Sequence, residues 1–181
     1  DLEKRLEEAI RENRDTIRRL AKELERVIED NKRRLEELKK EIKKVIEELE
    51  RELRRVRKDG RVKERIEEKV EKMVRDVERT LAELEKRSRE LVREIEEIIK
   101  RLKDSSEKLV REVEKVVEDG TTREIVDELV RRLKKHSDEA RKTVEDLRRK
   151  SKKSLREAEE TVKRLVEEIE RLLEEIKETM R

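Results

Sequence analysis

The chain has 181 residues, of which 59% are charged and 31% apolar, and it lacks Phe, Trp, Tyr, Cys and Pro. Without cysteine it has neither a disulfide framework nor a thiolate metal site, and it has no apolar run long enough to span a membrane. The 55 basic and 52 acidic side chains leave a formal net charge of only +3. Because the charges nearly cancel and the apolar residues are periodic, we expect long helices rather than disorder.

Two Asp-Gly pairs, Asp59-Gly60 and Asp119-Gly120, contain the only glycines of the chain. Glycine readily adopts the left-handed conformation that ends a helix, so the pairs divide the chain into three segments of similar length. Helices joined by such short loops must fold back beside each other. The sequence therefore predicts an all-α, antiparallel, up-down-up three-helix bundle as one domain over 1–181. We expect helices over about 2–58, 61–118 and 122–180, with loops at 59–60 and 119–121.

In the first segment the inward side chains recur in steps of 4, 4, 3, 4 and 3, so five turns take 18 residues. A seven-residue repeat imposes a left-handed supercoil and an eleven-residue repeat a right-handed one, whereas this period matches a straight, untwisted helix. The stripe consists of Leu2, Leu6, Ile10, Asn13, Ile17, Leu20, Leu24, Ile28, Asn31, Leu35, Leu38, Ile42, Ile46, Leu49 and Leu53.

The second and third segments keep the same period, from Val62 to Val116 and from Val126 to Met180. At a rise of about 1.5 Å per residue, each helix is expected to be roughly 85 to 90 Å long. Extra apolar positions beside each stripe widen it to the face that a self-contained bundle needs. Since no second apolar stripe remains for a partner, we expect a monomer without partners.

Residues at the predicted helix ends agree with this division. Asp1 is a suitable cap for the first helix, because its carboxylate can accept a bond from a free backbone N–H. Thr121 and Glu124 have the spacing of a capping box at the start of the third helix. Asp59-Gly60 is expected to close the first helix.

The short loops also predict which residues lie level. Residue i of the first helix should face about 119 minus i on the second, and residue j of the second should face about 239 minus j on the third. Asn31 then lies level with Ser88 and Ser151. One repeat further along, the same rule brings together only apolar residues, at Leu49 and its neighbours.

Asn13 lies level with Ser106 and, on the third helix, with residue 133, one turn from His136. An unpartnered buried amide or hydroxyl costs about 1 to 3 kcal/mol, so matched polar residues are easier to explain than scattered ones. The alternative is that Asn13 and Asn31 sit at the stripe edge in contact with water. We predict two buried networks: Asn31, Ser88 and Ser151, with Ser154 as a further candidate; and Asn13, Ser106 and His136, with Thr16, Ser105 and Ser137 as further candidates.

His136 is the only histidine, and the sequence does not supply the other residues that a metal-binding or catalytic histidine needs. A metal site needs several ligands at coordination spacing, and a hydrolytic Ser106-His136-Asn13 set would lack a cleft and oxyanion donors. We expect a neutral histidine satisfied by its polar neighbours, with a response to pH as the alternative. No metal, cofactor or enzymatic activity is expected.

The run 148–153 is the one dense basic patch, and basic patches attract phosphates. Glutamates follow it directly, and the chain has no aromatic side chain to stack on bases. We therefore expect no binding to nucleic acid. Membrane-surface binding is not expected either, because the core consumes the apolar faces. We expect no targeting signal, and hence a soluble chain that stays in the cytoplasm when expressed recombinantly.

The Asp-Gly loops, the 18-residue period and the matched positions of Asn13, Asn31, Ser88, Ser106, His136 and Ser151 resemble de novo designed helical bundles built parametrically with buried hydrogen-bond networks. The resemblance covers the whole chain and concerns a style of construction. It implies high thermal stability and no natural substrate. The expected function is a structural scaffold whose networks specify helix pairing and register.

A different interpretation is an interaction module, either one subunit of a designed helical assembly or a spectrin-like spacer. Natural long bundles usually carry aromatic core residues and irregular loops, which this sequence lacks. A subunit of an assembly needs an exposed apolar patch or an unpaired polar network, and the sequence pattern indicates neither. The mass in solution distinguishes a monomer from an assembly.

Overall fold

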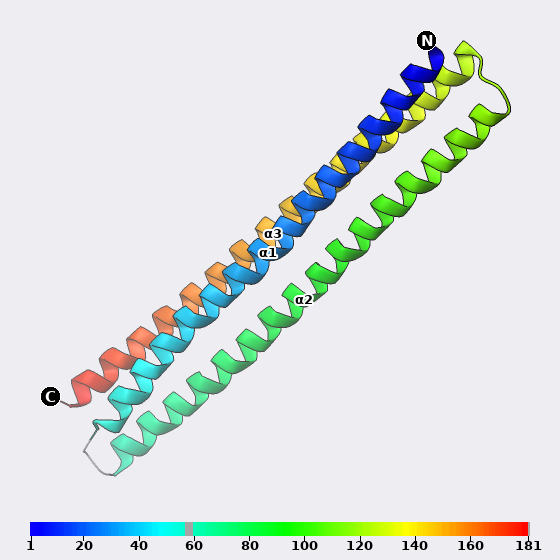
Figure 1. The fold of residues 1–181 in the computed structure, drawn as a ribbon. Coiled ribbons are helices and arrows are strands. Elements are labelled where there is room, and N and C mark those ends of the chain that lie inside the picture. The colour runs from blue at the N-terminus through cyan, green and yellow to red at the C-terminus, as the bar shows by residue number, and fades with distance from the viewer. Residues whose placement is uncertain (57–59, 181) are drawn as a thin grey trace. The chain divides into compact units, whose positions relative to one another are not determined.

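The computed structural model of the chain describes residues 1–56 and 60–180, and over these residues the protein is an all-α bundle of three long helices. Helix α1 spans Leu2–Arg54, α2 spans Arg61–Glu118 and α3 spans Arg123–Thr179. Figure 1 shows the chain reversing direction between α1 and α2 and again between α2 and α3. The predicted three-helix fold is confirmed.

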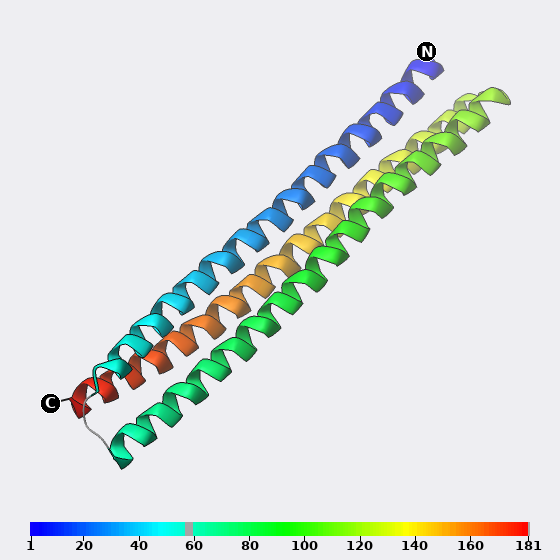
Figure 2. The same ribbon diagram turned by 60° about the horizontal axis from the view of Figure 1, so that its bottom comes forward.

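The bundle consists of two compact units, and each unit contains parts of all three helices. Unit 1 comprises Asp1–Glu29 and Leu91–Ser151, and unit 2 comprises Asp30–Glu90 and Lys152–Arg181. In unit 1 the N-terminus lies at the same end as the turn between α2 and α3 (Figure 2). The stretch of α1 in unit 1 therefore runs parallel to α3 and antiparallel to α2.

Buried aliphatic side chains hold each unit together. Unit 1 has two apolar clusters, one around Leu6 and Val126 and the other around Leu24 and Ile95. Unit 2 has one longer cluster, which includes Leu49. Each fully buried aliphatic side chain contributes about 1.5 to 3 kcal/mol, so these clusters supply most of the stability.

Helix α1 ends at Arg54, earlier than the predicted residue 58. The N–H groups of Arg55 and Val56 donate to carbonyls three residues back, those of Glu52 and Leu53, over 3.1 Å in each case. Such i to i+3 bonds tighten the last turn of a helix and end its α-helical pattern. Val56 is only 3% exposed, so this turn keeps its side chain in the core of unit 2. Residues 57–59, with the predicted loop residue Asp59, lie outside the described residues.

Both glycines have positive φ angles, 103° at Gly60 and 110° at Gly120, which other residues rarely adopt. They act at different ends of α2. The Gly120 N–H donates to the Val117 carbonyl over 3.1 Å and closes the helix, whereas the Gly60 carbonyl accepts from the Glu64 N–H over 3.2 Å and opens it. The expectation that Gly60 closes α1 was therefore wrong, because α1 has already ended at its tightened last turn.

The caps at the other helix starts agree in part with the sequence. Asp1 caps α1, since its Oδ1 accepts a bond from the Glu3 N–H over 3.2 Å. At α3 the cap is Thr122, whose Oγ1 accepts from the Ile125 N–H over 3.3 Å, rather than Thr121. The third residue after Thr122 is Ile125, which has no polar side chain to return the bond, so Thr122 caps α3 without forming a capping box.

Candidate functional site

Asn13 of α1 is the centre of a buried polar layer in unit 1, and it is only 1% exposed. Its Oδ1 accepts a hydrogen bond from Ser106 Oγ of α2 over 2.7 Å. Ser106 is itself 4% exposed. The two residues lie at the level that the loop positions predict, because 106 is 119 minus 13.

The Asn13 amide nitrogen faces α3. Its Nδ2 lies 3.3 Å from the Leu133 carbonyl oxygen, 2.9 Å from Ser137 Oγ and 3.0 Å from His136 Nδ1. An amide nitrogen has two hydrogens, so it donates to two of these three acceptors at a time. Ser137 Oγ in turn donates to the Leu133 carbonyl over 3.2 Å. One asparagine side chain therefore connects α1 with both other helices.

His136 completes this layer as an acceptor. Because Nδ1 faces the Asn13 NH₂ group, the neutral ring carries its hydrogen on Nε2. Burial lowers the pKa of His136 below its ordinary value, and the nearby Glu139 carboxylate opposes part of that effect. Protonation would add a hydrogen to Nδ1, and this N–H group would then face the Asn13 amide hydrogens without an acceptor between them. The geometry therefore favours the neutral ring.

The candidate members of this layer differ in their exposure. Ser137 joins it directly, and Thr16, nearly one turn further along α1, is buried. Ser105 is exposed, because it is one residue from Ser106 and so lies about 100° around the helix. The expectation for Ser105 was therefore wrong. The Leu133 carbonyl was not anticipated, since a side-chain pattern says nothing about which backbone oxygen accepts a second bond.

A second polar contact lies in unit 2. Asn31 is 2% exposed, and its Oδ1 accepts a hydrogen bond from Ser88 Oγ over 2.7 Å. These residues also follow the predicted level, because 88 is 119 minus 31. Ser151, the last residue of unit 1, is buried, and Ser154 in unit 2 is partly buried. Both asparagines of the stripe thus accept a hydrogen bond from a serine of α2.

The equivalent layer one repeat further along α1 is apolar. Leu49 and Ile169 are 0% exposed and Val70 is 3% exposed, and all three belong to the unit 2 core. Along the chain, Leu49 lies 18 residues from Asn31, and Val70 lies 18 residues from Ser88. The same helix geometry therefore accommodates a polar layer and an apolar one.

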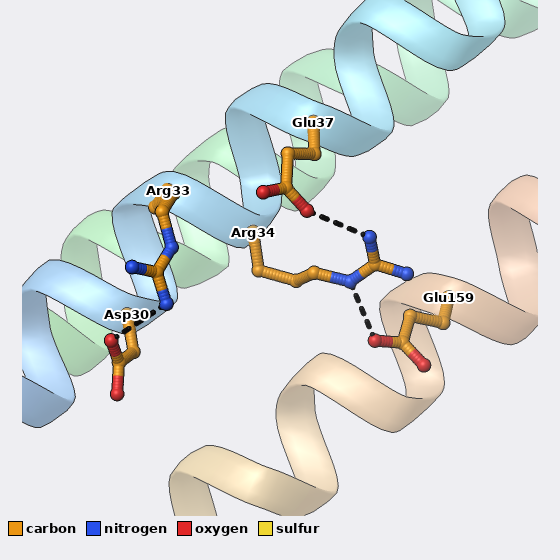
Figure 3. A network of polar contacts seen from close by, with 5 residues as sticks. All are labelled: Asp30, Arg33, Arg34, Glu37 and Glu159. Atoms are coloured by element: carbon orange, nitrogen blue, oxygen red, sulfur yellow. Dashed lines mark hydrogen bonds and ion pairs between the residues drawn. The ribbon is translucent and has the colours of Figure 1, made fainter.

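Ion pairs between helices lie at the edges of the core, and Figure 3 shows one of them in unit 2. Arg34 of α1 donates from Nε to Glu159 of α3 over 2.8 Å and from Nη1 to Glu37 over 3.0 Å. These hydrogen bonds, the one to Glu159 above all, raise the pKa of the guanidinium. Lys39 similarly pairs with Glu85 of α2, which raises the pKa of Lys39 and lowers that of Glu85.

The polar groups around His136 satisfy one another by hydrogen bonds. The Ser106 hydroxyl donates to Asn13, so its proton is directed away from the imidazole that a hydrolytic pair would need. Among residues 1–56 and 60–180, no group of three or more His, Cys, Asp or Glu side chains is placed to hold a metal ion. The layer can hold helices together and can respond to protonation of one ring.

Over the described part of the chain, no helix is both long and apolar enough to cross a membrane. Comparison with protein families, with curated proteins and with solved structures finds no match to this chain.

Proposed function

We propose that the chain is a designed structural scaffold, a thermostable and monomeric three-helix bundle without enzymatic activity. In this proposal its buried polar layers specify which helix surfaces meet and at which level. The straight helix geometry that follows from the 18-residue period is part of the same proposal.

The observation that carries the proposal is the set of bonds made by Asn13. Its carbonyl oxygen is bonded to α2 and its amide nitrogen to α3, and both bonds occur at the levels set by the loops. If either helix rotated or slid, a side chain that is 1% exposed would lose a partner. Leaving that amide unsatisfied costs about 1 to 3 kcal/mol, so other pairings are penalised.

The apolar layer at Leu49 supports this interpretation by contrast. It indicates that the stripe can be filled with aliphatic side chains at an equivalent place, where they contribute directly to stability. Choosing Asn13 instead gives up some of that contribution. A buried polar group of this kind is best attested as a device that selects register and partner.

The regularity of the chain supports a designed origin. Asn13 with Ser106 and Asn31 with Ser88 obey one level rule without deviation. Natural helical bundles accumulate irregular loops and irregular spacings, whereas idealised backbones use short, repeated ones. The common 18-residue period belongs to the second kind.

The test is a variant in which both layers become apolar, analysed by size-exclusion chromatography with light scattering and by NMR. It carries Asn13→Leu, Ser106→Ala, His136→Leu, Ser137→Ala, Asn31→Leu, Ser88→Ala and Ser151→Ala. The wild type should elute as one species near 22.1 kDa with one set of amide signals. The variant should remain helical and melt no lower, but should populate several species.

The matched control is Ser105→Ala, which removes an exposed hydroxyl beside the layer and should behave as the wild type does. A single monomeric species with one set of signals in the all-apolar variant would show that the layers do not select the pairing. A wild-type mass of two or three chains would contradict the monomeric scaffold and favour a subunit of an assembly.

A further inference from the structure

An apolar groove lies in unit 1 between the first turns of α1 and the last turns of α2. It has a volume of about 260 Å³, and its apolar lining comes from Leu2, Leu6, Ile10 and Val117. The residues that line it belong to α1, to α2 and, with Thr121, to the turn after α2. This volume is close to the lower end of the range for small-molecule sites, about 300 to 1,000 Å³.

The groove exists because the core is incompletely covered at this end of unit 1. Leu6 is only 3% exposed and belongs to the core, whereas Leu2, Ile10 and Val117 pack against that core and remain partly exposed. Their half-buried surfaces form a floor that a ligand could remove from water. Burying such surface is favourable by about 25 cal/mol per Å².

The rim of the groove is acidic. Glu3, Glu7 and Glu114 are its charged lining residues, and all three are exposed. None of them takes part in an ion pair within residues 1–56 and 60–180, although Arg5 close by pairs with Asp127. Glu3 and Glu7 are also four residues apart on one helix, where like charges repel. A positive group placed over the groove would relieve this repulsion.

The helix dipoles do not reverse the preference of the groove for a positive group. The start of α1 is positive and the end of α2 is negative, so their contributions at this level oppose each other. The positive end is also already capped by the Asp1 carboxylate. The three side-chain carboxylates therefore set the sign of the charge that the groove prefers.

We propose that this groove binds a small organic cation with an apolar body, such as an arylalkylammonium ion. The apolar body lies on the floor formed by Leu2, Ile10 and Val117, and the ammonium group lies among the carboxylates of the rim. Neither feature is sufficient alone, since the floor would accept any apolar molecule and the rim would attract any cation.

A hollow on α3 in unit 2 provides the contrast within the same molecule. It is lined by glutamates and Arg171 and has no apolar side chain in its lining. It offers acidic charge without a floor, so an arylalkylammonium ion should not bind there in a saturable way. Its glutamates serve as a control for the removal of negative charge.

The experiment titrates tryptamine, an indole with a cationic tail, into the protein at low salt and follows the methyl groups by NMR. Because the chain has no Phe, Trp or Tyr, large ring-current shifts of methyl signals report contact with the probe. Saturable shifts are expected at Leu2, Leu6, Ile10 and Val117. Indole-3-acetate, which has the same ring and a negative tail, should bind about tenfold more weakly.

Two matched variants separate local from general charge effects. Glu3→Gln/Glu7→Gln/Glu114→Gln should weaken tryptamine binding about tenfold, while Glu167→Gln/Glu174→Gln/Glu178→Gln should leave it unchanged. Val117→Leu, which fills the groove without altering charge, should also weaken it.

Three results would overturn the proposal. They are equal affinity for the two indoles, equal loss of affinity in the two triple variants, and methyl shifts spread along the helices instead of concentrated at the groove.

Discussion

The layer around Asn13 in unit 1 and the layer around Leu49 in unit 2 occupy equivalent places in the 18-residue period, yet one is polar and the other apolar. Asn13 is 1% exposed and Leu49 is 0% exposed, so burial does not distinguish them. What distinguishes them is whether the facing helices supply polar partners. Ser106 does so for Asn13, whereas Val70 at the level of Leu49 offers none.

The buried stripe therefore has two roles, stabilising the fold and selecting which helix surfaces meet. Aliphatic layers supply the free energy of folding, and they do so without distinguishing one aliphatic neighbour from another. A polar layer supplies less free energy, but it is satisfied only when particular residues meet. Unit 1 interrupts its core with such a layer, whereas unit 2 has a continuous apolar cluster that runs along α1 from Leu35 to Leu49 and includes Val56 beyond the end of that helix.

The largest expected effect comes from placing a polar side chain in the apolar layer. Leu49→Asn should lower the free energy of unfolding by about 4 kcal/mol, because it removes a buried aliphatic side chain and buries an amide without a partner. Denaturation by guanidinium measures the change. Leu49→Met is the matched control and should cost under about 1.5 kcal/mol. A loss below that level for Leu49→Asn would mean that this layer tolerates polar groups as the Asn13 layer does.

A smaller effect should follow from pH, through His136 in the polar layer. Burial places its folded-state pKa below the ordinary value of about 6.5. The unfolded chain therefore binds more protons below pH 6.5, so stability is full above that value and falls as the pH drops toward the folded-state pKa. Urea denaturation between pH 7.5 and 5.5 should show this loss.

His136→Gln provides the control for this titration, because the amide can still accept a bond from Asn13 but does not ionise in this range. Its stability should change less between the same two pH values. A pH dependence identical to that of the wild type would place the sensitivity elsewhere, and the polar layer would then not respond to protonation.

The smallest effect concerns the surface ion pairs between α2 and α3. The charge of the α2 partner in these pairs differs between the two units. In unit 1 the α2 partner is acidic, as in Glu112–Arg132 at 3.0 Å, whereas in unit 2 it is basic, as in Lys69–Glu175 at 2.6 Å. Glu112→Arg should cost about 0.5 kcal/mol, and adding Arg132→Glu should restore most of it. Thermal melts of the two variants at low salt measure the difference. Absence of any restoration would show that the pair contributes nothing to helix pairing.

Much of the fold could be predicted because two glycines and one period determine it. The level rule placed Asn13 with Ser106 and Asn31 with Ser88, since a loop of fixed position leaves little freedom to slide. The apolar layer at Leu49 followed from the same rule and is confirmed.

The details that sequence could not supply are local and conformational. The early end of α1 depends on a tightened turn that buries Val56, and the cap of α3 depends on which of two adjacent threonines reaches a free N–H. The choice of the Leu133 carbonyl as an acceptor for Asn13 depends on side-chain rotamers. Residue types and their spacing contain no signal for any of these.

The most direct test of the central claim, that Asn13 and its partners act as a matched set, is a comparison of two free energies of unfolding. Asn13→Leu alone should lose about 2 kcal/mol, because it leaves the Ser106 hydroxyl without its acceptor and His136 and Ser137 without their donor. Adding Ser106→Ala, His136→Leu and Ser137→Ala should regain at least that loss, since no polar group of the set then remains buried. A fourfold variant no more stable than Asn13→Leu alone would contradict the account.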